Sequence, residues 1–130
     1  MILIDTHVAL WLAFDPSQIS AKARTAIESA RAAGKGLAIC DITILELATL
    51  VSKGRVRLDA SLESLLEELE SRFVVLPITG RACVRAVSLS ASYPNDPADR
   101  IIGATALVEG LPLVTADRAI RQSEVLRTIW

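Results

Sequence analysis

The chain has few aromatic, cysteine and histidine residues, and no surplus of charge of either sign. Of its 130 residues only 4% are aromatic, two are cysteines and one is a histidine, and the formal net charge is -1. Cys40 and Cys83 do not make a disulfide framework, and we expect both to be small core side chains in a reducing compartment. A net charge near zero argues against a protein that coats nucleic acid through many cationic contacts to phosphate. It leaves open an enzyme that acts on nucleic acid through bound cations.

Long apolar runs and flexible linkers are also absent. No stretch approaches the roughly 18 consecutive apolar residues of a membrane span, and the apolar start reaches Asp5 without the basic flank of a signal peptide. We therefore expect a cytoplasmic protein. The chain has no low-complexity tract or internal repeat, and its hydrophobic residues, 52% of the total, are spread evenly. Residues 1–130 are thus expected to form a single domain that folds without a disulfide or a structural metal.

Short apolar runs alternate with longer segments of helical spacing. The unbroken character of the apolar runs is typical of strands buried on both faces, which we predict at residues 2–4, 37–40, 73–78 and 111–114. Capping residues and terminal glycines frame helices at residues 7–14, 21–33, 42–51, 62–72, 81–91 and 97–108, with a further short helix after Thr115. This alternation predicts an α/β fold with a parallel sheet covered on both sides. In such folds ligands bind beyond the carboxyl ends of the strands.

Acidic residues follow the predicted strands repeatedly. Asp5 and Asp41 come directly after the first two strands, and Asp117 lies two residues beyond Thr115 at the end of the last. Asp99 lies in the first turn of the helix before that strand, and Glu46 lies early in the helix after the second strand. These residues are far apart in the chain, so only the fold can bring them together.

Glu46 is the most informative of the acidic residues, because its helix is apolar nearly all round. A carboxylate there is partly buried or borders a cleft, and it needs a cation, a partner or a raised pKa. Several converging carboxylates repel one another, and a hard divalent cation such as Mg²⁺ or Mn²⁺ relieves that repulsion. With one histidine and no closely spaced cysteine pair, the sequence disfavours a zinc site.

Each acidic residue also has an ordinary structural role open to it. Asp5, Asp96 and Asp117 can cap helices. Asp99 can complement a helix dipole or pair with Arg100 or Arg118.

The cationic and aromatic residues leave alternatives open as well. His7 is expected to be a core residue or a residue that supports a metal ligand, and not a metal ligand itself. The cationic run at residues 53–57 can contact phosphates, but a solvated turn after a helix is its default interpretation. Trp11 and Trp130 fit a partner surface or the core equally well.

Four segments together resemble the PIN-domain proteins, and more narrowly the VapC toxins of bacterial type II toxin–antitoxin systems. They are ILIDTH at the start, ILEL around Glu46, NDPADRIIGATA around Asp99 and LVTAD at Asp117. The segment around Asp99 is the most specific of the four. The resemblance implies a PIN-like three-layer α/β/α domain with a central, mainly parallel sheet of four to five strands.

The resemblance also implies a function and a set of site residues. Relatives of this kind are endoribonucleases that depend on Mg²⁺ or Mn²⁺, and their acidic residues map onto Asp5, Glu46, Asp99 and Asp117 as the catalytic set. Of these we expect Asp5, Asp99 and Asp117 to be metal ligands, with Thr6 and Thr115 orienting the carboxylates. Metal-assisted attack by water on RNA would leave 5′-phosphate and 3′-hydroxyl ends. The implied partners are an inhibitory VapB-like antitoxin, the RNA substrate and a second copy of the chain, with no membrane partner.

Other functions remain to be weighed against this one. A phosphatase with an aspartate nucleophile would need a second aspartate where the chain has His7, and a phosphoacceptor receiver domain would need a lysine after a late strand. The serious alternative is a non-catalytic PIN-like module that interacts or regulates without turnover. Retained like charges argue against such a module. The role of Asp96, a ligand or a helix cap, stays open.

Overall fold

Five short strands build one fully parallel sheet in the computed structural model, which describes residues 1–130. The neighbouring strands pair in the order β3-β2-β1-β4-β5. Their bounds are β1 Ile2–Ile4, β2 Leu37–Cys40, β3 Val74–Leu76, β4 Leu113–Val114 and β5 Thr128–Ile129. The predicted parallel sheet is confirmed, and its five strands are the larger of the two expected numbers.

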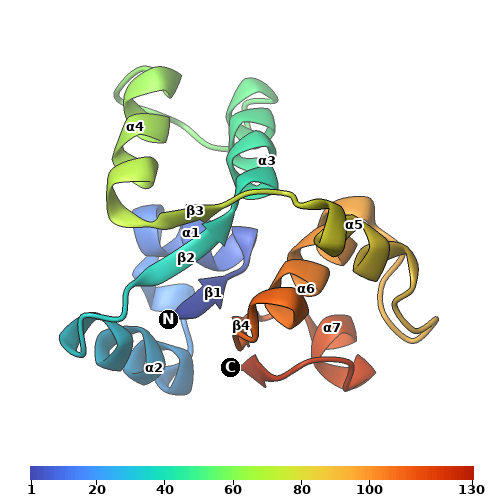
Figure 1. Ribbon diagram of the computed structural model, residues 1–130. Helices are drawn as coiled ribbons and strands as arrows, with labels where there is room; N and C mark the ends of the chain where they lie inside the picture. The colour runs from blue at the N-terminus through green and yellow to red at the C-terminus, as the bar shows by residue number, and fades with distance from the viewer.

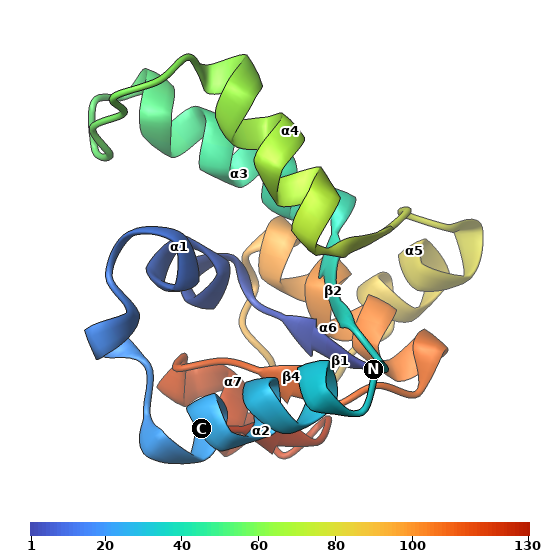
Figure 2. The ribbon, with the colours of Figure 1, turned by 90° about the vertical axis from the view of Figure 1, so that its left-hand side faces the viewer.

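Helices cover both faces of this sheet and make the expected three-layer α/β/α arrangement (Figure 1). Their bounds are α1 Thr6–Phe14, α2 Ala21–Ala32, α3 Asp41–Ser52, α4 Leu62–Arg72, α5 Gly80–Val87, α6 Pro97–Glu109 and α7 Arg118–Ser123, with one 3-10 turn, η1 Pro16–Gln18. Figure 2 shows α3 and α4 side by side, extending away from the sheet. Not one of the helices combines the length and the apolar character needed to cross a membrane.

The strand residues alternate between two apolar cores, one on each face of the sheet. Ile2 and Ile4 point into a core shared with the first four helices, whereas Leu3 points into a core shared with α6 and α7. In β2, Leu37 and Ile39 join the first core and Ala38 and Cys40 join the second. Both faces are buried, which explains why these strands are unbroken apolar runs in the sequence.

Side-chain caps set where several helices begin. The hydroxyls of Ser20, Ser61 and Thr79 accept hydrogen bonds from backbone N–H groups three residues later, at the starts of α2, α4 and α5. Such a cap satisfies one of the four N–H groups left free at a helix start. The predicted starts of α2 and α4 are confirmed for this reason.

The prediction that residues 73–78 form a strand buried on both faces was wrong. The strand β3 covers only Val74–Leu76 and lies at the edge of the sheet, where the side chain of Val74 is 44% exposed. An edge strand has a neighbour on one side only, so fewer of its residues are paired and covered. The strand β5 was missed because only two of its residues pair, Thr128 and Ile129.

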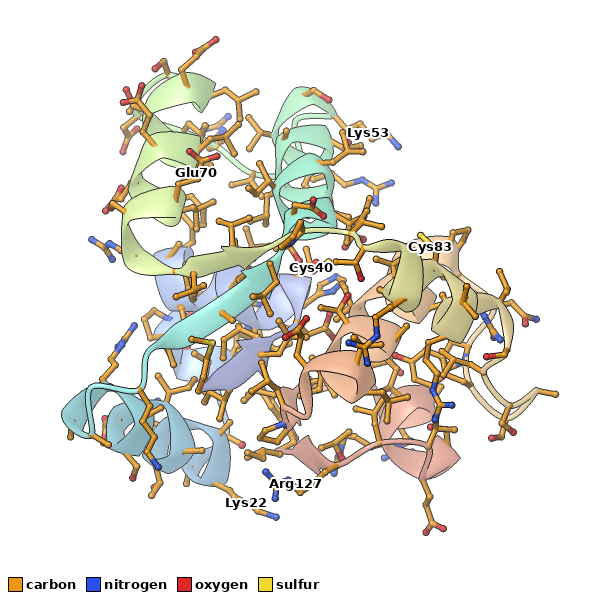
Figure 3. The ribbon with its side chains drawn as sticks, in the orientation of Figure 1. Lys22, Cys40, Lys53, Glu70, Cys83 and Arg127 are labelled. Atoms are coloured by element: carbon orange, nitrogen blue, oxygen red, sulfur yellow. The ribbon has the colours of Figure 1, made fainter.

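The two cysteines differ in their surroundings. Cys40 is fully buried at the end of β2, as predicted, and burial raises the pKa of its thiol. Cys83 is exposed on α5, so its assignment to the core was wrong (Figure 3). The helix α5 also ends at Val87 instead of continuing to residue 91.

Candidate functional site

Asp5 stands where the chain leaves the central strand and enters α1. The chain runs from β1 outward to β2 and β3, then returns to build β4 and β5 on the other side of β1. The carboxyl ends of β1 and β4 therefore form the point where neighbouring connections diverge, which is where open α/β sheets bind ligands. The Asp5 side chain is only 6% exposed.

Two hydrogen bonds fix the carboxylate of Asp5. Its Oδ1 accepts from the backbone N–H of Thr6 at 2.8 Å, and its Oδ2 accepts from Oγ1 of Thr115 at 2.6 Å. The Thr115 oxygen in turn accepts from the backbone N–H of Asp117 at 3.1 Å. The predicted orienting role of Thr115 is confirmed by this geometry. Burial raises the pKa of Asp5, and these hydrogen bonds oppose that rise only in part.

Glu46 reaches the same place from α3. Its Oε1 accepts a hydrogen bond from Oγ1 of Thr6 at 2.6 Å, which confirms that Thr6 orients a carboxylate. The Thr6 hydroxyl has one proton to donate, so the hydroxyl of Thr43, 3.0 Å away, donates to Thr6. The half-buried position predicted for Glu46 is confirmed. Burial is the main cause that raises its pKa, and the charges of Asp5 and Asp96 add to the effect.

Asp99 lies in the first turn of α6 and is partly buried. Its carboxylate takes part in no hydrogen bond or ion pair, although its backbone N–H donates to Asp96 and its carbonyl accepts from Tyr93. Burial raises the pKa of Asp99 to about 7, with further contributions from the negative charges of Asp96, Asp5, Asp117 and Glu46. A carboxylate that is neither paired nor fully solvated is in an unusual state for a protein.

Asp117 and Asp96 both cap helices. The Oδ1 of Asp117 accepts from the backbone N–H of Ile120 at 3.0 Å, at the start of α7. The Oδ1 of Asp96 accepts from the backbone N–H of Asp99 at 3.0 Å, at the start of α6. Asp96 therefore caps α6, which is one of the two roles that the sequence left open for it. Each cap also leaves a second carboxylate oxygen free of hydrogen bonds within the chain.

The fold thus brings the four predicted site residues within electrostatic reach of one another. Asp5 and Asp117 come from the ends of β1 and β4, Glu46 from α3 and Asp99 from α6. None of them forms an ion pair with a lysine or arginine, because the only ion pair of the molecule joins Arg72 to Glu68 on α4. The result is a concentration of negative charge at one edge of the sheet.

Arg100 follows Asp99 in the chain but does not pair with it. Its guanidinium donates to the backbone carbonyls of Ala86 and Leu89 at 3.0 and 2.9 Å, and to those of Tyr93 and Pro94 at 3.3 and 3.1 Å. These bonds fasten the end of α5 and the following loop to the start of α6. Sequence reasoning missed this role, since nothing in the local pattern shows which carbonyls a guanidinium will meet.

Asp41 and His7 lie elsewhere than the sequence suggested. The Asp41 carboxylate accepts from the backbone N–H of Ile78 at 3.1 Å, so it stabilises the segment after β3 and does not join the acidic group. The helix α3 begins at Asp41 itself, and Cys40 is its cap residue. His7 is exposed and lines a groove beside Glu46, which excludes the core position and leaves the other predicted role, support for a ligand.

The donor set fits a hard divalent cation. Every candidate ligand is a carboxylate, which is the chemistry that Mg²⁺ and Mn²⁺ prefer, and the carboxylate of Asp99 has no partner within the chain. No three acidic, histidine or cysteine side chains are close enough together in this structure to ligate one ion. A cation would reduce the mutual repulsion of these carboxylates.

The raised pKa of Asp99 predicts a pH-dependent stability of the metal-free protein. Below pH 4 the carboxyl is protonated in both the folded and the unfolded chain, so it contributes nothing. As the pH rises from about 4 towards 7, the unfolded chain loses this proton first, and the folded state is destabilised. We expect Asp99→Asn to remove this loss and to stabilise the metal-free protein by about 1–2 kcal/mol above pH 7, after allowing for solvent screening.

Thermal unfolding in EDTA at several pH values measures this effect. The Tm advantage of Asp99→Asn should be absent near pH 4, grow up to pH 7 and then level off. With Mg²⁺ or Mn²⁺ added, the unsubstituted protein should gain stability and the variant much less. An advantage that does not vary with pH would contradict the burial of a charged Asp99.

Comparison with known proteins gives consistent matches over almost the whole chain. The PIN domain family is matched over residues 2–125. A curated relative, "Ribonuclease VapC22" of Mycobacterium tuberculosis (strain ATCC 25618 / H37Rv), is 39% identical over 131 residues, which cover 99% of this chain and 98% of the relative.

Solved structures share the fold. A structure of VapBC2 from Rickettsia felis, bound to a DNA fragment from its promoter, superposes with a TM-score of 0.74 at 19% identity, covering 98% of this chain and 97% of that one. A toxin–antitoxin complex from Klebsiella pneumoniae gives a TM-score of 0.62 at 25% identity, covering 90% and 87%. At these identities the structures support the fold, and the curated relative carries the closer sequence likeness.

Proposed function

Because the chain belongs to the PIN-domain family, we propose that it is a metal-dependent endoribonuclease and the toxin of a type II toxin–antitoxin pair. The observation that carries the proposal is the group of four carboxylates, none of them in an ion pair, at the diverging ends of β1 and β4. The 39% identity to a ribonuclease over nearly the full length supports the substrate class.

We assign the ion to Asp5, Asp99 and Asp117, with Glu46 completing the catalytic set. Asp5 is held by two hydrogen bonds and is the most buried of these residues, so we take it to fix the position of the site. Asp99 must lose its proton before it can bind a cation, which its pKa of about 7 allows at neutral pH. A bound divalent ion would lower the pKa of the water molecule bound to it and would neutralise negative charge on the phosphate that is cleaved.

Glu46 contributes differently, because it is oriented by Thr6 and lies beside a groove. Its Oε1 accepts the hydrogen bond from the Thr6 hydroxyl. Its Oε2 is therefore free to hold a water molecule near the substrate, or to take a proton from that water. Its raised pKa brings it closer to the range in which a carboxylate exchanges protons at neutral pH. Attack by water would release 5′-phosphate and 3′-hydroxyl ends, with no need for a 2′-hydroxyl nucleophile.

The proposed partners are an antitoxin and a second copy of the chain. The relatives of known structure include toxin–antitoxin complexes, some of them bound to DNA. For this chain we propose an antitoxin whose C-terminal segment occupies the groove beside the carboxylates and so blocks RNA. Homodimerisation is a prediction from the family, which sedimentation of the purified protein checks.

The test is cleavage of total cellular RNA by the purified, antitoxin-free protein. With Mn²⁺ or Mg²⁺ we expect discrete cuts, and with EDTA none. Mapping the new 5′ ends identifies the substrate, and their direct ligation to an adaptor reports a 5′-phosphate. Total RNA is used because it offers every candidate target of the cell of origin. Intact RNA despite measured ion binding would favour the alternative, a non-catalytic PIN-like module.

A further inference from the structure

A groove of about 410 Å³ leads away from the carboxylates along α3, and its two ends differ in charge. At one end it is lined by Thr6, Glu46 and Asp96. At the other end it is lined by Lys53 and Arg55, which follow α3. Figure 3 shows Lys53 at the end of α3 that lies far from the sheet. The groove is thus acidic where the site lies and cationic beyond it.

A specific helix ending gives the cationic end its shape. The N–H of Gly54 donates to the carbonyl of Val51, and the N–H of Arg55 donates to that of Leu50, both at 3.0 Å. This is a Schellman motif, and it requires the left-handed conformation that Gly54 adopts at φ +70°. The chain reverses at the glycine, so residues on both sides of it line the same groove.

Both cations are free of partners within the chain. Lys53 and Arg55 are exposed, and neither side chain forms an ion pair or a hydrogen bond. A cation near a helix C-terminus complements the helix dipole, which is reason enough for Lys53. The field of the dipole falls off within the last turn of the helix. It therefore does not explain the second cation, Arg55, which follows the glycine and lines a groove that ends at carboxylates.

Resting on the proposed function, we propose that Lys53 and Arg55 bind phosphates of the RNA strand next to the cleavage position. The carboxylates repel a polyanion, and a bound divalent ion offsets that repulsion only close to itself, because salt screens charge interactions over distances greater than about 8 Å. A strand that enters the groove therefore needs further cations along its path. These two are positioning residues, since they lie beyond the catalytic set and would act by holding the strand in register.

An acidic segment of a protein partner could also meet these cations. The RNA backbone is the better match, because the groove is continuous with the carboxylates proposed to cut it, and the same strand must pass both. Phosphate contacts of this kind carry little sequence information, so they should act on any single-stranded RNA.

The experiment compares two double variants in an Asp99→Asn background, which prevents cleavage. Lys53→Gln with Arg55→Gln removes the two groove cations. Lys22→Gln with Arg127→Gln removes the same charge at the opposite end of the molecule, where both residues are labelled in Figure 3. Binding of a fluorescein-labelled oligouridine is measured by anisotropy over a range of salt concentrations, and thermal unfolding confirms that each variant is folded.

We expect the groove variant to bind oligouridine about tenfold more weakly than the background protein, and the control to bind as the background does. The slope of log affinity against log salt should fall by about 1.4 in the groove variant, because each phosphate contact on a single strand contributes about 0.7. With Asp99 intact, the groove variant should raise KM for a cleaved RNA with little change in kcat, and Lys53→Arg should preserve KM.

The outcomes that overturn the proposal are distinct from those that overturn the proposed function. If both the groove variant and the control bind oligouridine as tightly as the background protein does, the phosphate contacts are overturned. The proposed RNA cleavage is unaffected by that result, which would favour the acidic protein segment as the partner of the two cations. Equal weakening in both variants also overturns it, because a general charge effect explains that result. Failure of the unsubstituted protein to cleave or bind any RNA overturns the proposed function and this inference with it.

Discussion

Replacing Asp99 by asparagine is expected to lower the rate of RNA cleavage at least about 100-fold while leaving the fold intact. The change removes a proposed metal ligand and its negative charge but keeps the size of the side chain. The backbone contacts of Asp99 with Asp96 and Tyr93 do not involve its carboxylate, so they are retained. Initial rates on the mapped RNA substrate, with saturating Mn²⁺, measure the effect.

Asp96→Asn is the matched control, because Asp96 lies at the same helix start. Asparagine caps a helix as well as aspartate does, so this variant should cleave RNA at nearly the rate of the unsubstituted protein. Asp5→Asn should be as inactive as Asp99→Asn. More than a few per cent of activity in either inactive variant would contradict the assignment of the ligands. An inactive Asp96→Asn would place Asp96 in the site.

Gly103→Ala is expected to destabilise the protein by about 2–3 kcal/mol, the cost of overpacking a tight core. A Cβ at position 103 would overlap the hydroxyl of Tyr93 and lie 2.6 Å from its Cζ. Tyr93 is only 1% exposed and its hydroxyl donates to the carbonyl of Asp99 at 2.8 Å, so a shift of the ring would disturb a buried side chain and this hydrogen bond. The substitution therefore strains the start of α6, where Asp99 lies. Denaturant unfolding measures the loss.

Gly80→Ala provides the control for the intrinsic effect of a methyl group in a helix. Gly80 is the first residue of α5, and a Cβ there would meet no atom within 4 Å. Alanine favours helix over glycine, so this variant should be unchanged or slightly more stable. A Gly103→Ala protein as stable as the Gly80→Ala protein would show that the packing of Tyr93 against α6 is looser than described.

Much of the fold could be predicted from the sequence, because local patterns encode it. The strands at residues 2–4 and 37–40 and the helix at residues 62–72 have the predicted bounds. Unbroken apolar runs are buried on both faces, and a serine before a helical pattern satisfies its first N–H groups. The errors at β3, β5 and the end of α5 fall at the edges of the sheet and on its outer layer, where burial depends on neighbours distant in sequence.

The candidate site could be predicted only in part. That acidic residues follow apolar strands is visible in the sequence, and so is the conflict between Glu46 and its apolar helix. Asp5 and Asp41 look alike by this criterion, since each directly follows a buried strand. The structure separates them, because Asp5 lies at the diverging ends of β1 and β4 whereas Asp41 binds the N–H of Ile78 beside the edge strand.

The sequence by itself therefore determined the element types, the parallel sheet and the kinds of side chain at the strand ends. Only the tertiary structure decided which carboxylates share one electrostatic environment, that Arg100 binds carbonyls instead of Asp99, and that Lys53 and Arg55 line the groove of Glu46. The physical reason is the range of the forces involved. Backbone hydrogen bonds, caps and apolar periodicity act over a few neighbouring residues, whereas charge interactions and desolvation depend on distances in space that the strand order and the packing of the helices on the sheet fix.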